Sequence, residues 1–313
     1  MADTPPAVVL DRVTVIYGKN RALRDVSAVF PAGAVGLLGP NGAGKSTMLK
    51  SLLGFIEPAS GRLEVLGMNV AEKPLEVRAR LGYMPETDGH IPGMNAVTFV
   101  AYCGQLAGLP KADAMQRAHE TLFYVGLGEA RYRNLETYST GMKQRIKLAQ
   151  ALVHDPDLVF LDEPTNGMDP KGREEMLELI RDIAHNKGIN LILSSHLLPD
   201  VEYTCDHVVV LDKGTVATFG PIEELKGPSG RVYEVRVKGD LAPFIAALQG
   251  AGMECRETDE DVMRVFVPGT VGHAGGDQQN ICAVAGQVRV QVRHLKTSLP
   301  TLEDVFARAI GEL

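Results

Sequence analysis

Cysteine, positive charge and long apolar runs are all scarce in this 313-residue sequence. Four scattered cysteines without a C-x-x-C pair favour inert thiols in a reducing compartment over disulfides or a zinc site. The formal net charge of −7 argues against a general nucleic-acid or anionic-membrane binder, so no nucleic-acid partner is expected. The cysteines are Cys103, Cys205, Cys255 and Cys282.

No apolar stretch of the sequence is typical of a membrane-spanning helix. Residues 1–6 are polar and lack the apolar centre of a signal peptide. The uncharged stretch 91–110 approaches the length of a span, but glycines and prolines interrupt it. We therefore expect a chain that is soluble by itself and depends on another chain for any span. The stretch 91–110 is either a docking surface for a partner or the core of its own subdomain, and the sequence favours neither.

A glycine-rich loop is the strongest motif present. Residues 39–47 fit G-x-x-x-x-G-K-[ST] and lie between a strand-like stretch, 34–38, and a helix-like stretch, 46–53. In that context the backbone N–H groups of the loop can surround a phosphate chain. Lys45 can reach the outer phosphates, and the Ser46 hydroxyl can ligate Mg²⁺. The predicted phosphate-binding residues are Gly39, Pro40, Asn41, Gly42, Ala43, Gly44, Lys45, Ser46 and Thr47.

Two carboxylates follow the apolar stretch 158–161, which has the pattern of a parallel strand covered on both faces. Ligands of open α/β sheets bind at the carboxyl edge of such strands. Asp162 is placed there to bind Mg²⁺, directly or through water. Glu163 points elsewhere and could take a proton from an attacking water.

Further segments occur with these motifs in a fixed order, namely 17–18, 83–86, 138–142, 167–169 and 195–196. Together the segments resemble the ATP-binding subunit of an ABC transporter, and the resemblance extends from residue 8 to about residue 220. The resemblance implies that ATP and Mg²⁺ are the cofactors. It also implies a role for Tyr17 in stacking on adenine and a role for His196 in sensing the γ-phosphate and positioning water beside Glu163. Its other site residues are Glu86 in the Q-loop, Ser139 and Gly141 in the signature sequence, and Asp169 in the D-loop.

Ser139 opens a helix-like stretch and is a good N-cap, and the free N–H groups of a helix start suit an anion. In the family this element contacts the γ-phosphate that the other subunit binds. The resemblance therefore implies a head-to-tail homodimer around two ATP molecules. Without the resemblance, Ser139 would be only a structural cap and His196 a structural histidine.

Two positions depart from the common family pattern. The signature reads Tyr-Ser-Thr-Gly-Met at 138–142 in place of Leu-Ser-Gly-Gly-Gln, and Glu86 replaces the usual glutamine. A glutamate ligates hard cations more strongly, but it adds negative charge beside Asp162 and Glu163. We hypothesise that Glu86 still reaches the metal and couples the site to the helical subdomain. These departures, together with the ending 300–306, resemble the ABC-2 type export branch.

The predicted fold is α/β: a P-loop NTPase core of ABC type with an antiparallel β subdomain and an inserted helical subdomain, plus a small C-terminal α+β domain. Strand-like alternation covers 8–17 and 22–30, and strand signals vanish between 88 and 140. The expected domains are an ATP-binding domain, 1–227, with its helical subdomain at about 88–140, and an accessory domain, 228–313.

The function expected from these features is ATP hydrolysis that powers a separate transmembrane permease subunit, in the export direction, from the cytoplasmic side of the cell membrane. A second ATP-binding subunit completes the assembly. The alternatives are a soluble ABC-type ATPase and a nucleotide-dependent regulatory module that is not coupled to transport. The first lacks the tandem domains or coiled coils of its class, and Asp162, Glu163 and His196 count against the second.

Overall fold

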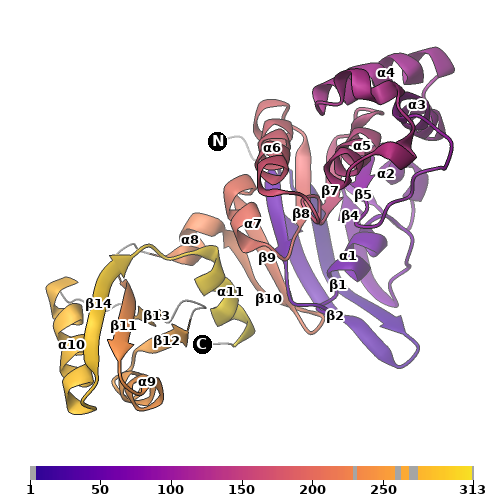
Figure 1. The fold of residues 1–313 in the computed structure, drawn as a ribbon. Coiled ribbons are helices and arrows are strands. Elements are labelled where there is room, and N and C mark those ends of the chain that lie inside the picture. Colours follow the sequence, from indigo (N-terminus) through magenta and orange to yellow (C-terminus); the bar gives the residue numbers. More distant parts are fainter. Residues whose placement is uncertain (1–4, 228–230, 258–261, 268–273, 312–313) are drawn as a thin grey trace. The chain divides into compact units, whose positions relative to one another are not determined.

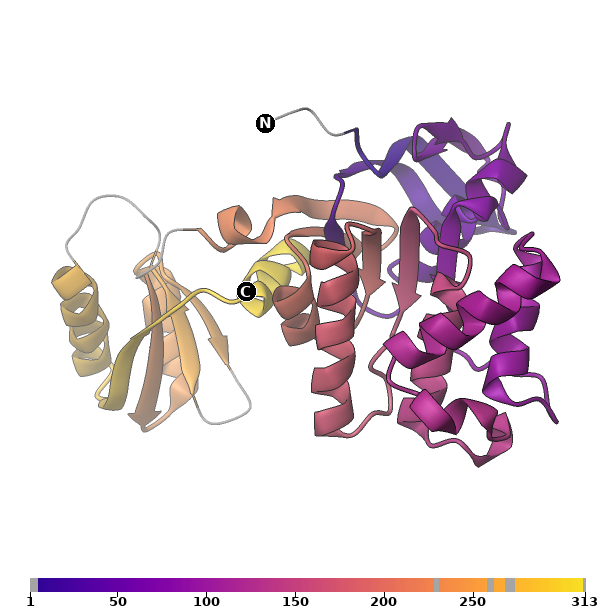
Figure 2. The same ribbon diagram turned by 90° about the horizontal axis from the view of Figure 1, so that it is seen from above.

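The computed structural model describes residues 5–227, 231–257, 262–267 and 274–311. These residues form two compact units, Met1–Ile222 and Glu223–Leu313. Figures 1 and 2 show the elements of each unit in two views.

A six-stranded sheet with the order β10-β9-β3-β8-β7-β6 forms the centre of the first unit. Its strands are parallel from β9 to β6, and only β10 pairs antiparallel with its neighbour β9. The parallel order brings the carboxyl ends of β3, β7 and β8 to the same edge. The strands are β3 (Ala34–Leu38), β6 (Leu81–Met84), β7 (Leu158–Asp162), β8 (Asn190–Ser194), β9 (His207–Asp212) and β10 (Thr215–Pro221).

Helices accompany the strands of this sheet, and two of them have a proline in the first turn. Pro170 and Pro199 occupy the first turns of α6 and α7, where proline is tolerated because the N–H it lacks has no intrahelical partner. A π-helical turn, η3 (Asp182–Asn186), extends α6. The helices are α1 (Lys45–Leu52), α2 (Pro74–Ala79), α5 (Thr140–Leu152), α6 (Pro170–Arg181), α7 (Leu198–Thr204) and α8 (Ile222–Lys226).

A second, antiparallel sheet with the order β2-β1-β4-β5 packs beside the first. Its strands bury alternate residues, as half-buried strands do. Leu23 from this sheet and Leu37 and Phe160 from the parallel sheet belong to one apolar core. This sheet is the predicted antiparallel β subdomain. The strands are β1 (Val8–Tyr17), β2 (Asn20–Phe30), β4 (Ser60–Val65) and β5 (Met68–Asn69).

The predicted helical subdomain is also confirmed, and Figure 2 shows its magenta helices apart from the indigo antiparallel sheet. The uncharged stretch 91–110 is partly core and partly surface: Phe99 and Val100 are buried, whereas Tyr102 and Leu106 are exposed. Asn95 caps α3 by accepting from the Thr98 N–H. The elements are α3 (Ala96–Leu106), α4 (Lys111–Tyr124), η1 (Gly128–Tyr132) and η2 (Leu135–Thr137).

Helix α5 lies directly against β6. A Cβ atom at Gly82 would come within 2.1 Å of the Ala151 carbonyl oxygen, a distance that no side chain tolerates. Glycine at this position therefore allows α5 to approach the backbone of the strand.

The second unit is a four-stranded antiparallel sheet with the order β12-β13-β11-β14. Two helices, α9 and α10, contribute to its core beside the sheet, with Phe244 and Ile281 packed near Tyr233 and Val265. The elements are β11 (Val232–Lys238), α9 (Leu241–Gly250), β12 (Glu254–Glu257), β13 (Met263–Phe266), α10 (Ala274–Gln287), β14 (Gln291–Ser298) and α11 (Leu302–Ile310). Among the described residues of both units, no helix combines the length and apolarity that crossing a bilayer requires.

Candidate nucleotide site

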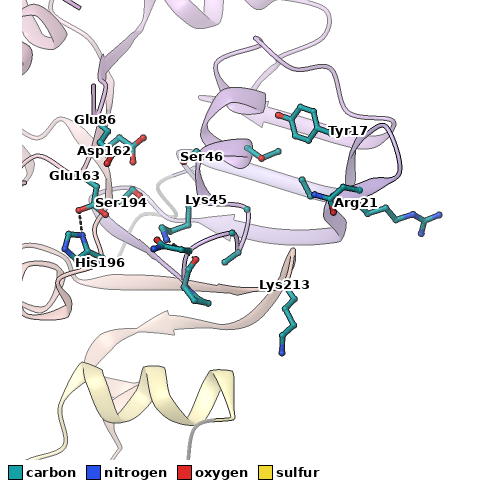
Figure 3. A pocket seen from close by; sticks show the side chains of 18 of the residues that line it. Tyr17, Arg21, Lys45, Ser46, Glu86, Asp162, Glu163, Ser194, His196 and Lys213 are labelled. Atoms are coloured by element: carbon teal, nitrogen blue, oxygen red, sulfur yellow. Dashed lines mark hydrogen bonds and ion pairs between the residues drawn. The ribbon is translucent and has the colours of Figure 1, made fainter. Parts of the chain in front are cut away.

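A cavity of about 790 Å³ opens at the carboxyl edge of the parallel sheet. Figure 3 shows Tyr17 and Arg21 on one side of the β3–α1 loop, and Glu86, Asp162, Glu163 and His196 on the other. Its lining includes most of the residues predicted from the sequence: Tyr17, Pro40, Asn41, Gly42, Ala43, Gly44, Lys45, Ser46, Thr47, Glu86, Asp162, Glu163 and His196.

The loop leaves donors free toward this cavity. Gly42 and Gly44 have φ angles of 80° and 108°, a left-handed region that favours glycine. Helix α1 has no side-chain cap, so its first N–H groups remain free for an anion. Lys45 Nζ donates to the carbonyls of Gly39, at 2.5 Å, and Pro40, at 3.3 Å. Burial lowers the pKa of Lys45, and the carboxylates of Glu163 and Asp162 oppose that shift.

A carboxylate and an imidazole face each other at the end of β7. His196 Nδ1 lies 2.7 Å from Glu163 Oε2. The side chain of Glu163 is 11% exposed and that of His196 is 57% exposed, so the ring forms the open side of the pair. Burial raises the pKa of Glu163, and the hydrogen bond with His196 lowers it in part. A base with a raised pKa accepts a proton more readily near neutral pH, as general-base catalysis requires.

Glu163 also has an uncommon backbone conformation, with φ at 51°. For a residue other than glycine this left-handed conformation costs free energy and is found often at functional sites. The Glu163 N–H donates to the Ser194 carbonyl at 2.9 Å, which ties the turn to β8.

Oxygen donors at this cavity fit Mg²⁺, a hard cation that takes oxygen ligands and usually keeps phosphate or water among them. Ser46, Asp162 and Glu86 supply such oxygens. Buried Ser194 lines the same cavity, close enough to Asp162 that its hydroxyl lowers the pKa of that carboxyl against the larger, raising effect of burial. In the described ranges no cluster of three or more His, Cys, Asp or Glu could hold a metal alone. The donor set therefore suits a cation that arrives with a nucleotide.

A buried network supports the chain on both sides of this site. Asp200, on α7, accepts from Thr165 Oγ1 at 2.7 Å and from Arg173 Nε at 2.7 Å. Thr165 follows Glu163 by two residues, and Asp200 follows His196 by four. The network therefore fastens the segment after β7 to the segment after β8.

Some predicted residues lie outside the cavity lining: Gly39, Ser139, Gly141 and Asp169. Ser139 is the N-cap of α5, where its Oγ accepts from the Met142 N–H at 3.4 Å. Asp169 is the N-cap residue of α6 but makes no side-chain cap hydrogen bond. A Cβ at Gly167 would lie 3.1 Å from Thr140 Cγ2, so the start of α5 lies close to the segment before α6.

The cavity also includes residues that sequence reasoning missed. Arg21 and Arg24 come from β2, and Lys213 comes from the β9–β10 hairpin. The Arg24 N–H donates to the Gly214 carbonyl at 2.8 Å, which joins these two segments. Their charge was a possible signal, but only strand pairing brings them to the loop. The other missed lining residues are Asn20, Ala22, Asn166 and Ser194.

A strand–loop–helix phosphate cradle opposite two strand-edge carboxylates defines a P-loop NTPase. The family model for "ABC transporter" matches residues 23–166. YxlF of Bacillus subtilis (strain 168), an uncharacterized ABC transporter ATP-binding protein, is 38% identical over 302 residues, covering 94% of this chain and 96% of that protein. The bacitracin transport ATP-binding protein BcrA of Bacillus licheniformis is 31% identical, covering 96% of this chain and 95% of that protein.

A solved ATP-binding subunit of an ABC transporter has a TM-score of 0.63 and 29% identity, covering 70% of this chain and 92% of that one. The chain belongs to the family of ABC transporter ATP-binding proteins, and it is an ATP-hydrolysing subunit of a transport system. This confirms the family, fold class and ATPase activity expected from the sequence.

Proposed function

We propose that this ATPase powers a separate transmembrane permease subunit in the export direction, as a peripheral protein on the cytoplasmic side of the cell membrane. The observation that carries the proposal is the gathering of the phosphate loop, Asp162, Glu163 and His196 around one cavity. A chain that needed only to sense a nucleotide would not require a base hydrogen-bonded to a histidine. The likeness to BcrA, named for bacitracin transport, supports transport as the coupled process.

In the proposed reaction, Glu163 accepts a proton from the water that attacks the γ-phosphate of ATP. His196 holds the carboxylate of Glu163 through its Nδ1 atom, and its exposed ring faces the γ-phosphate. Lys45 exchanges its two carbonyl partners for phosphate oxygens when ATP enters. Ser46, Asp162 and Glu86 would hold Mg²⁺, which neutralises charge on the phosphates when bound.

We further propose that two copies of the chain enclose two ATP molecules head to tail. The position of Ser139 supports this proposal, because its helix start does not line the cavity of its own chain. An exposed N-cap with free N–H groups suits a phosphate offered from outside. Gly141 and Asp169 would lie at the same interface, and Tyr17 would stack on the adenine of the chain's own nucleotide.

Residues 228–313 are proposed to be an accessory domain beside an ATP-binding domain formed by 1–227. The described part of the second unit forms its own core, which supports a separate domain. Its contribution is proposed to lie in assembly, because the phosphate loop, Asp162, Glu163 and His196 all belong to the first unit.

Co-purification with the membrane protein encoded beside this chain, followed by an ATPase assay in vesicles, tests the proposal. We expect a stable complex whose rate of phosphate release rises several-fold when a transported compound is added. An ATPase that neither binds a membrane protein nor responds to one would instead favour the soluble or regulatory alternatives. Uptake into inside-out vesicles, in contrast to efflux from them, would support the export direction.

A further inference from the structure

Helix α5 carries a lysine that is almost fully buried. The side chain of Lys147 is 1% exposed, although it does not line the nucleotide cavity. Removing an ammonium group from water costs several kcal/mol unless close partners compensate for it. Burial lowers the pKa of Lys147, and the carboxylate of Asp88 is the largest opposing influence.

Both close partners of this lysine lie in the segment that follows β6. Lys147 Nζ donates to the Glu86 carbonyl at 2.7 Å and lies 3.5 Å from Asp88 Oδ1. Lys143, one turn earlier, pairs with the other oxygen of Asp88 at 3.5 Å, but its side chain is 35% exposed. The two lysines therefore hold the same segment, and only Lys147 contacts Glu86.

The negative charge of Glu86 repels that of Asp162, and the positive charge of Lys147 can offset this repulsion. The side chain of Glu86 lines the cavity, and Figure 3 shows it beside Asp162. Like charges repel each other, and Glu86 adds to the rise in the pKa of Asp162 that burial causes. The ammonium group of Lys147 approaches the same segment from α5, and its charge is opposite to that of both carboxylates. It can do so because the glycine at position 82 lets α5 lie close to β6.

We propose that Lys147 is a positioning residue that holds segment 86–88 on α5 and offsets the carboxylate of Glu86, so that Glu86 faces the nucleotide site. The same contact links the helix that begins at Ser139 to a cavity residue. The inference rests on the proposed function, in which Glu86 works at the nucleotide site.

A set of neutral variants separates the charge of Lys147 from its hydrogen bond. Lys147→Met removes both, whereas Lys147→Gln keeps a donor for the Glu86 carbonyl. We expect kcat of the full-length protein to fall about tenfold in Lys147→Met, with KM for ATP within about twofold, and the Mg²⁺ concentration for half-maximal rate to rise. Lys143→Met is the matched control, because it loses the Asp88 pair alone, and we expect its kcat and Mg²⁺ dependence to stay near wild type.

A double-mutant cycle with Glu86→Gln tests the charge compensation itself. Glutamine has no charge to offset, so Lys147→Met should cost at least threefold less in that background than in the wild type. Equal losses in both backgrounds, or a Lys143→Met loss as large as that of Lys147→Met, would overturn the proposal. If Lys147→Met does not fold by circular dichroism, Lys147→Gln takes its place in the cycle with the same criteria. The cycle needs only ATP hydrolysis, so its result is independent of any membrane partner. A wild-type ATPase rate that does not change when a membrane partner is added would count against the proposed function and not against the role of Lys147.

Discussion

The two units of the chain bury charged groups in different ways. In the first unit Asp162, Glu163 and Lys45 converge on an open cavity, and the hydrogen bonds that Lys45 makes within the described part of the chain go to backbone carbonyls. In the second unit, the buried side chain of Asp304 accepts from Arg264 Nη2 at 2.8 Å and from the Thr301 N–H at 2.9 Å. The first arrangement leaves capacity for a ligand, and the second uses the charge to fasten α11 to β13. Burial of charge therefore indicates a site where the charged groups line an open cavity, and a structural role where oppositely charged side chains pair with each other.

The largest effect should come from the proposed base. Glu163→Gln keeps the size of the side chain but cannot accept a proton, so turnover should fall by roughly 10³-fold. ATP should remain bound and hold two copies together, which size-exclusion chromatography with ATP would detect. Exposed Glu174 on α6 offers a matched Glu→Gln control. Steady hydrolysis by Glu163→Gln would remove this residue from the role.

In the second unit, a substitution at the buried Asp304 should lower the free energy of unfolding. Asp304→Ala leaves Arg264, whose side chain is 12% exposed, without its 2.8 Å partner. Arg264 keeps Glu234 as a partner at 3.3 Å, so the variant should lose about 1–3 kcal/mol of unfolding free energy. Hydrogen exchange of β13 amides measures the loss, and Glu303→Ala, whose side chain is 45% exposed, is the control on the same helix. A loss below about 1 kcal/mol would mean that this pair does not fasten the helix.

A smaller effect is expected at the mouth of the cavity. Tyr17 is 48% exposed at the end of β1, so an adenine ring could cover its face. Removing one aromatic contact costs about 1 kcal/mol, or roughly a fivefold weaker ATP affinity in Tyr17→Ala. Tyr17→Phe should bind ATP like the wild type, because the ring remains. Equal affinity in Tyr17→Ala, measured by isothermal titration, would contradict adenine stacking.

The smallest effect concerns the stability of the nucleotide-free protein. Because burial raises the pKa of Asp162, the folded state takes up a proton at higher pH than the unfolded state does. The ionised Asp162 therefore destabilises the folded state, and this destabilisation grows as pH rises toward the folded-state pKa. At lower pH, where the carboxyl is protonated in both states, the destabilisation disappears. Asp162→Asn should raise the Tm of the nucleotide-free protein at neutral pH, by an amount that shrinks as pH is lowered. A difference that does not change with pH would show that the carboxylate does not titrate in this way.

The sequence predicted the core of the site because its signals are local. Residues 39–47 contain the complete loop, and Asp162 and Glu163 follow a recognisable apolar strand. In contrast, Arg21 and Lys213 reach the cavity through strand pairing between distant segments, which no motif records. The burial of Lys147 could not be predicted either, because a lysine within a helix normally faces solvent.

The bounds of helices and strands could also be predicted only where the local sequence pattern is strong. Strand β7 follows its apolar run closely, whereas α10 (Ala274–Gln287) was not predicted because glycine, asparagine and glutamine weaken its periodicity. The alternating residues 288–293 predict a strand, but β14 begins only at Gln291. The apolar spacing over 173–185 predicts one helix, whereas the structure begins α6 at Pro170 and continues it as the π turn η3, which has no distinct side-chain pattern.

The close approach of Gly82 to Ala151 lies near one end of α5, so Ser139 and Lys147 stand at unequal distances from it along the helix. With a rise of 1.5 Å per residue, Ser139 lies about 18 Å from that contact along the helix, and Lys147 about 6 Å. A tilt of about 5° around the contact would move Ser139 by about 1.6 Å and Lys147 by only about 0.5 Å. A small displacement of segment 86–88 that keeps the hydrogen bond between Lys147 and the Glu86 carbonyl would therefore move Ser139 about three times as far as Lys147.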